Sequence, residues 1–330
     1  MSEFRQNFAT REWVIIAPER SLRPADIVAQ RTSGDALPVW SERCPFCPGN
    51  EAITARELHR VGDDALWSMR VVLNKYAALS MDEEVDRRRV GRFLAAGSHG
   101  HAEVLIESPR HNLVLADMDV RAVEELLLLY RRRLAEVSTW PDVAIVMIFR
   151  NSGPNAGTSL AHPHSQLIAS PIIPPHIRDP LDKAMLHYDT WGSCVYCDLL
   201  DEELRQCDRI LWEHRHAVAL CPFASRTPYE VRIYPRKHNA SFIWTGDEEI
   251  RGVAELLLKS VRALRDALGD PSYNVLLRSS PVGDEDVRYL HWYFVLVPRL
   301  STPAGFEMGS GIYINPIPPE QAAAELRIHG

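Results

Sequence analysis

The stretch Asn151-Ser152-Gly153-Pro154-Asn155-Ala156-Gly157-Thr158-Ser159-Leu160-Ala161-His162-Pro163-His164-Ser165-Gln166 decides how the rest of the chain is interpreted. A hydrophobic run at 143–149 leads into a loop of small residues, which ends in two histidines separated by one proline. Alternate side chains of an extended segment share one side, so we expect His162, His164 and Gln166 to face the same way. The small residues let backbone N–H groups approach an anion closely. The pattern favours a nucleophile beside a phosphate-binding loop.

Length and charge restrict the possible classes of protein. The chain has 330 residues, enough for two domains with separate cores, and its 46% hydrophobic content is typical of globular proteins. The net charge of −7 argues against broad binding to nucleic acid, although it permits a nucleotide in a local pocket. No apolar stretch approaches about 20 residues and the N-terminus lacks a signal-peptide pattern. We therefore predict a cytoplasmic protein with no membrane partner.

Two C-x-x-C pairs, Cys44-Pro-Phe-Cys47 and Cys194-Val-Tyr-Cys197, are the main feature of the cysteine pattern. Without a secretion signal, such pairs indicate metal or redox chemistry before a structural disulfide. Each pair is followed by two histidines, and the interval from His111 to His162 nearly equals that from His238 to His291.

The order of elements repeats along the chain. A helix capped by Asp117 or Asp119 is predicted to run to about Val137, and its counterpart to run from near Thr245 to about Leu268. Each helix is followed by a predicted strand and each histidine pair encloses one such unit. The predicted fold class is α+β: a tandem duplication with antiparallel sheets, each packed with a long helix. Prolines in residues 171–182 place the domain boundary near 180, giving domains 1–180 and 181–330.

Each copy of the unit contains a candidate zinc site. Two thiolates and two imidazoles suit a closed tetrahedral zinc, which would be structural. The alternative is that these residues are ordinary core cysteines and surface histidines. The first candidate set is Cys44, Cys47, His111 and His162, and the second is Cys194, Cys197, His238 and His291.

His164 is the histidine left over from the first set. A neutral imidazole nitrogen can attack phosphorus and form a covalent intermediate. A hydrogen bond from its other ring nitrogen to a backbone carbonyl would fix the reactive tautomer. Gln166 and Ser159 could donate to phosphate oxygens. The alternative makes both His162 and His164 metal ligands.

The motif Asn-x-Gly-x-x-Ala-Gly-x-Ser-x-x-His-Pro-His-x-Gln at 151–166 resembles the active-site signature of galactose-1-phosphate uridylyltransferases, a branch of the histidine-triad superfamily. The resemblance covers nearly the whole chain, and its other parts are 44–51, 74–76, 221–226 and 305–308. It implies two histidine-triad-like domains and a ping-pong exchange. UDP-glucose leaves a uridylyl group on His164 and releases glucose 1-phosphate, and galactose 1-phosphate then accepts the group.

The same resemblance implies roles for further residues. His164 matches the nucleophile and Gln166 a phosphate contact; in the family the C-terminal segment can reach the partner subunit's site, which implies a homodimer. The implied substrate contacts are Arg20, Arg23, Asn74, Asn151, Gly157, Ser159, Phe306 and Glu307.

The chain departs from many relatives in two places. It has His291-Trp292-Tyr293 where relatives have His-Trp-His, so the second copy is expected to be catalytically silent. The loop 301–304 lacks a lysine that relatives carry, which leaves the sugar and phosphate selectivity open.

Three functions remain in order of preference after these observations. The first is uridylyl exchange between UDP-glucose and a hexose 1-phosphate. The second is an ADP-glucose or diadenosine-polyphosphate phosphorylase, since a branch with two cysteine-containing zinc sites has these activities. The third is a zinc-stabilised nucleotide-binding protein without turnover.

Overall fold

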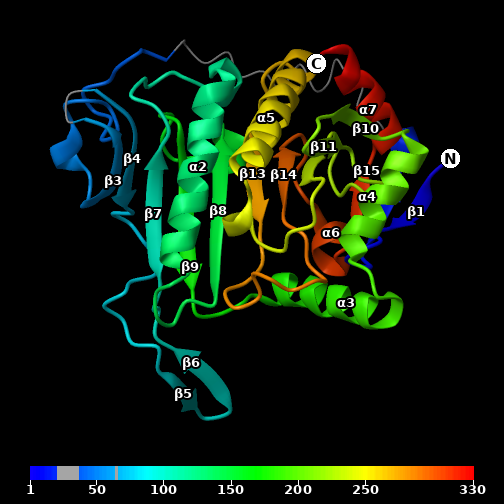
Figure 1. The fold of residues 1–330 in the computed structure, drawn as a ribbon, viewed down its shortest axis with the longest axis horizontal. Helices are drawn as coiled ribbons and strands as arrows, with labels where there is room; N and C mark the ends of the chain where they lie inside the picture. The colour runs from blue at the N-terminus through cyan, green and yellow to red at the C-terminus, as the bar shows by residue number, and fades with distance from the viewer. Residues whose placement is uncertain (21–36, 64–65) are drawn as a thin grey trace.

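A ten-stranded antiparallel sheet forms the centre of the computed structural model, which describes residues 1–20, 37–63 and 66–330 (Figure 1). The strand order is β10-β11-β12-β14-β13-β8-β9-β7-β4-β3. The half from the N-terminal part of the chain contains β3 (Glu57–Gly62), β4 (Trp67–Leu73), β7 (His101–Ile106), β8 (Ile145–Ser152) and β9 (His164–Ser170). The other half contains β10 (Ile210–Glu213), β11 (Ala217–Leu220), β12 (Val231–Pro235), β13 (Tyr273–Arg278) and β14 (Tyr293–Pro298).

The two halves of the sheet have the same internal order. Counting outward from the centre, β8, β9, β7, β4 and β3 match β13, β14, β12, β11 and β10. The central pair, β8 and β13, is hydrogen-bonded and antiparallel, so the two copies join edge to edge. The predicted duplication and α+β class are confirmed, and the two predicted sheets form one continuous sheet.

One long helix from each copy covers the same face of the sheet. Helix α2 (Val120–Val137) begins where predicted, because the Asp119 carboxylate accepts a hydrogen bond from the Ala122 N–H at 2.8 Å. Helix α5 (Asp247–Leu268) ends at Gly269, whose φ of 74° allows the left-handed turn. The two helices lie side by side in Figure 1 and share one hydrophobic core with the sheet.

The opposite face is covered differently in the two halves. In β11, Ala217 and Ala219 face the α5 core, whereas Val218 and Leu220 face α3 (Pro175–Trp191) and α4 (Val195–Gln206). In the other half the segment around Cys44 and Cys47 takes this position and packs on β4 and β7. The boundary predicted near residue 180 falls inside α3, and the two-domain division stays a prediction.

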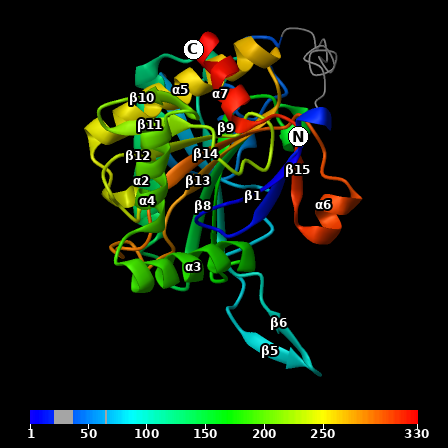
Figure 2. The ribbon, with the colours of Figure 1, turned by 90° about the vertical axis from the view of Figure 1, so that its right-hand side faces the viewer.

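Smaller elements complete the fold. A three-stranded sheet joins β1 (Glu3–Gln6), β2 (Trp13–Ile16) and β15 (Tyr313–Asn315), with α6 (Gly305–Ser310) and α7 (Pro319–Ile328) beside it or after it in the chain. The hairpin of β5 (Arg87–Val90) and β6 (Phe93–Ala96) projects from the body of the molecule (Figures 1 and 2). In the described ranges, no helix is long and apolar enough to cross a membrane.

Candidate functional site

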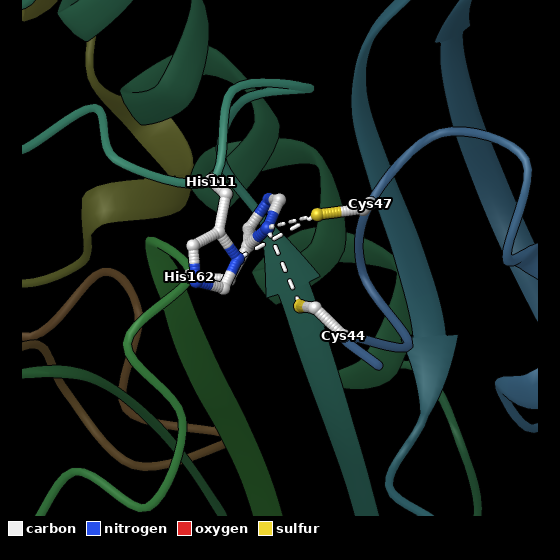
Figure 3. Close-up of side chains that lie close together, drawn as sticks. All are labelled: Cys44, Cys47, His111 and His162. Atoms are coloured by element: carbon white, nitrogen blue, oxygen red, sulfur yellow. Dashed lines mark hydrogen bonds between the residues drawn. The ribbon is translucent and has the colours of Figure 1, made fainter. Parts of the chain in front are cut away.

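Four side chains predicted as a metal set converge in the first copy (Figure 3). The Nδ1 atom of His162 lies 3.6 Å from the sulfurs of both Cys44 and Cys47, and the Nδ1 atom of His111 lies 3.5 Å from the Cys47 sulfur. All six cysteines of the chain are free thiols, so no disulfide competes for these sulfurs. The set comes from the Cys44–Cys47 turn, the segment after β7 and the turn before β9.

The spacing of these atoms fits a tetrahedral zinc. Zn–S bonds of about 2.3 Å and Zn–N bonds of about 2.05 Å at a tetrahedral angle place sulfur and nitrogen roughly 3.6 Å apart. The Nε2–H of His162 donates to the Ser108 carbonyl at 2.7 Å, which leaves the Nδ1 lone pair directed at the thiols. Burial lowers the pKa of His162 to about 4, which favours the neutral ring that binds metal. The residues therefore suit the metal that the sequence predicts.

The second predicted set also converges, in the second copy. The Cys197 sulfur lies 3.3 Å from Nδ1 of His238 and 3.4 Å from Nδ1 of His291, and Cys194 completes the group. His291 donates through Nε2 to the Pro235 carbonyl at 3.1 Å, as His162 does to Ser108. His238 is exposed, so this group lies nearer the surface than the first. Both Cys/His groups could hold a metal ion.

His164 is oriented as a nucleophile would be. It begins β9, is 7% exposed, and its Nδ1–H donates to the His162 carbonyl at 2.8 Å. Nε2 therefore carries the free lone pair. Burial lowers the pKa of His164, partly offset by the His162 carbonyl and by the charge of Glu107, so the neutral ring is favoured. Since His162 directs its ring at the cysteines, the two histidines have different surroundings.

The residues of β9 alternate between the two faces of the sheet. Ser165 and Leu167 face α2: Leu167 lies in the core beneath it, and the Ser165 hydroxyl hydrogen-bonds the α2 residue Tyr130. His164 and Gln166 consequently share the opposite face, as predicted. The ring of Phe46, from the Cys44–Cys47 turn, packs edge-on against His164 with centroids 5.4 Å apart. The candidate metal site thus supports the candidate nucleophile directly.

The loop before the histidines is fixed at its start. Asn274 of β13 donates through its side-chain amide to the Asn151 side-chain oxygen at 2.8 Å and to the Ala156 carbonyl at 2.9 Å. Gly157 has a φ of 85°, a conformation that other residues rarely adopt, and it closes the short helix η4 (Pro154–Ala156). Ser159 is exposed farther along the same loop. Residues Asn151, Gly157 and Ser159 therefore belong to one loop that ends at His164.

A buried charged network lies beneath the His-Pro-His segment. The Glu107 carboxylate is fully buried and accepts from the Arg150 Nε at 2.9 and 3.1 Å and from the Ser165 hydroxyl. The N–H of Glu107 also donates to the Pro163 carbonyl at 3.1 Å. Glu107 and Ser108 therefore anchor the backbone and the ring of the histidine segment from two sides.

We predict that Glu107→Gln lowers the free energy of unfolding by about 3 kcal/mol, because it leaves the buried Arg150 guanidinium without a counter-charge. Urea denaturation measures this change. The matched control is Glu125→Gln, which removes an exposed i,i+4 partner of Arg121 and should cost about 0.5 kcal/mol or less. Equal losses in the two variants would contradict the role of the network.

The structure does not gather every predicted substrate contact around His164. Arg20 is exposed at the end of the short helix η1 (Pro18–Arg20), and Arg23 lies outside the described residues. Asn74 follows β4 and its side chain accepts from the Tyr76 N–H at 3.0 Å. Phe306 and Glu307 lie on α6 beside β15, away from β9 (Figure 1), and in the described part of the chain no hydrogen bond joins them to His164.

The sequence gave no signal for several residues that organise this region. Glu107, Arg150, Tyr130 and Asn274 come from four different elements, and only the strand pairing brings them together. The Arg150–Glu107 pair could not be recognised because each residue occurs in an otherwise ordinary strand sequence.

The duplicated fold and the buried histidine define a class of two-copy α+β proteins in which one copy presents a histidine beside a small-residue loop. Within this class, the model of the galactose-1-phosphate uridyl transferase N-terminal domain matches residues 1–174. A second model, described as a domain of unknown function, matches residues 123–328.

Three relatives are similar over nearly their whole length. An ADP-glucose phosphorylase of Arabidopsis thaliana is 34% identical, with 98% of this chain and 92% of that protein covered. A galactose-1-phosphate uridylyltransferase of Thermotoga maritima is 31% identical, with 99% and 98% covered. The crystal structure of an ADP-glucose phosphorylase from Arabidopsis thaliana with bound ADP-glucose has a TM-score of 0.83 at 31% identity, covering 99% of each chain.

The chain belongs to the galactose-1-phosphate uridylyltransferase family of nucleotidyltransferases. That family includes both uridylyltransferases and ADP-glucose phosphorylases.

Proposed function

We propose that the protein transfers a nucleotidyl group from a nucleoside-diphosphate hexose to a phosphate acceptor by way of His164. The observation that carries the proposal is the orientation of this ring. Its Nδ1–H is held by the His162 carbonyl at 2.8 Å, and its Nε2 faces away with a free lone pair. Asn151, Gly157 and Ser159 of the preceding loop are the proposed phosphate contacts.

In the first half-reaction, Nε2 of His164 attacks the α-phosphorus of the donor. A P–N bond forms, the bond from this phosphorus to the bridging oxygen breaks, and hexose 1-phosphate leaves with the electron pair. The leaving group is a phosphate and needs no proton, so no general acid is required. The Gln166 amide donates to a non-bridging oxygen as charge develops there.

In the second half-reaction, an oxygen of the acceptor phosphate attacks the same phosphorus. The P–N bond breaks and the pair returns to Nε2, so the neutral ring is restored. Burial keeps the pKa of His164 low, which favours this neutral form between the two steps.

Among the activities of the family we place adenylyl transfer from ADP-glucose to phosphate first. Two complete Cys/His groups are present, which the resemblance associates with the phosphorylase branch. The Arabidopsis phosphorylase is also similar in fold, with a TM-score of 0.83. Uridylyl exchange between UDP-glucose and galactose 1-phosphate is the second candidate, because the family model and the Thermotoga relative both point to it.

Labelling with two donors distinguishes these activities. We expect the protein incubated with ADP-glucose carrying 32P at the α-phosphate to retain acid-labile label, and to retain at least tenfold less from UDP-glucose labelled in the same way. Inorganic phosphate should then release labelled ADP. Preferential labelling by UDP-glucose, discharged only by galactose 1-phosphate, would reverse the order. Failure to label with either donor would favour the binding protein without turnover.

We further propose one structural Zn²⁺ at each Cys/His group. In the first group the metal would hold the Cys44–Cys47 turn against His162 and so keep the neighbouring loop in place; it takes no part in either chemical step. The distances of 3.3 to 3.6 Å between sulfur and nitrogen support zinc at both groups.

We also propose that the active unit is a cytoplasmic homodimer acting on a nucleotide sugar and a sugar phosphate. Phe306 and Glu307, the predicted hexose contacts, lie on α6 beside β15 and apart from His164 of the same chain. Their placement supports a contribution to the site of a second copy.

A further inference from the structure

A cavity of about 260 Å³ opens on the second half of the sheet, on the face opposite α5. Its floor consists of alternate residues of three strands, among them Arg232 of β12, Arg278 of β13 and Tyr293 of β14. Residues of α3 and the segment from Arg226 to Glu230 form its walls. None of the roles assigned so far uses this cavity, apart from His291 at its edge.

The strand pairing makes this cavity the counterpart of the His164 site. In the second copy Arg278 pairs with Tyr293. In the first copy Arg150 pairs with Ser165, so the next residue, Asn151, lies beside His164. Tyr293 therefore occupies the position of His164, and Arg278 that of Asn151. A site for a phosphorylated ligand has kept its position while its nucleophile has been replaced.

The charges that line the cavity are unbalanced. Arg232 pairs with Glu230 at 2.9 Å, and Arg226 pairs with Glu12. Arg278 and Arg299 also line the cavity, and among the described residues neither has an ion-pair partner. Two positive charges are thus available, which matches the charge of one phosphate dianion.

The cavity also contains polar atoms that lack a protein partner. Within the described ranges, the Thr227 and Ser280 hydroxyls and the Arg299 Nε are buried and form no hydrogen bond. An unpaired buried polar atom costs about 1–3 kcal/mol, so such a group is usually satisfied by a ligand or water. Three of them beside two unpaired arginines indicate a polar, anionic occupant.

We propose that this cavity binds a small phosphate monoester, with the phosphate held by Arg278 and Arg299 and the hydroxyl-bearing part near Thr227 and Ser280. The planar guanidinium groups suit phosphate oxygens. The volume is below the 300–1,000 Å³ that drug-sized ligands occupy, so a hexose phosphate fits better than a nucleoside-diphosphate sugar. Because Tyr293 replaces the histidine, the ligand is bound without transfer, at a second site separate from His164.

Calorimetric titration with glucose 1-phosphate tests the proposal. The wild-type chain should show one binding event that the double variant Arg278→Gln/Arg299→Gln lacks or weakens at least tenfold, because charge-assisted hydrogen bonds are lost. Arg236→Gln, which removes an arginine paired with Glu213 outside the cavity, is the matched control and should bind as wild type. Equal binding by wild type and the double variant would overturn the proposal.

Two further measurements separate this site from the His164 site and from loss of folding. Labelling of His164 by the nucleotide-sugar donor should be unchanged in the double variant; its loss together with glucose 1-phosphate binding would place these arginines in the transfer site and overturn the inference. In crystals of the wild-type chain soaked with tungstate, an anomalous peak is expected between Arg278 and Arg299. Its absence counts against the site even if the double variant fails to fold.

Discussion

Replacing His164 by asparagine is expected to abolish nucleotidyl transfer while the fold is retained. The Asn side-chain N–H can take the place of Nδ1–H and donate to the His162 carbonyl, which now accepts at 2.8 Å. The variant has no nitrogen lone pair at the position of Nε2, so no P–N bond can form. We expect a loss of roughly 10⁴-fold or more in kcat, the scale that follows removal of a nucleophile in covalent catalysis.

The measurement is retention of 32P from the α-labelled donor together with single-turnover rates. His329→Asn, at an exposed histidine near the C-terminus, provides the same substitution without the chemistry and should label as wild type. The urea midpoint of His164→Asn should remain close to that of the wild-type chain. If this variant still acquires acid-labile nucleotide, the group on phosphorus is carried by another residue.

The duplication was predictable because both copies keep the pattern that builds a fold unit. The spacing from each C-x-x-C to its histidines and the apolar stripes of the two helices depend on residues close in sequence. The strands at 210–213 and 273–278 have the predicted bounds, and α2 begins at the predicted cap. The joining of the halves was missed, since an edge-to-edge contact between β8 and β13 leaves no periodic signal.

The candidate site divides in the same way. His162 and His164 could be assigned different surroundings from the repeat alone, because His162 has a counterpart in His291 whereas His164 faces Tyr293. Their supports could not be predicted. Glu107 and Arg150 are separated by α2, and Asn274 comes from the other copy, so only the three-dimensional pairing identifies them. Placement of Phe306 and Glu307 depends on a second chain, which no single-chain pattern contains.

Loss of the first metal group is expected to affect both stability and chemistry. Cys47→Ser removes the sulfur that contacts both His111 and His162, at 3.5 and 3.6 Å, and serine oxygen is a poor zinc ligand. Zinc measured by mass spectrometry should fall from about two to about one per chain. Since binding to the native state alone stabilises it, the free energy of unfolding should fall by at least about 3 kcal/mol.

Two matched cysteine variants make this result specific. Cys207→Ser, at an exposed cysteine outside both groups, should retain both zinc ions and wild-type stability. Cys197→Ser should lose one zinc ion from the second group yet keep nucleotidyl labelling, because Tyr293 rather than a nucleophile adjoins that group. Cys47→Ser should lose zinc and most of the labelling together, since His162 and the Phe46 ring then no longer hold His164 in place. If Cys47→Ser retains both zinc ions, or if the unfolding of the wild-type chain is insensitive to a chelator, the four residues form a reduced thiol–imidazole cluster and the support for His164 must come from the Glu107 network alone.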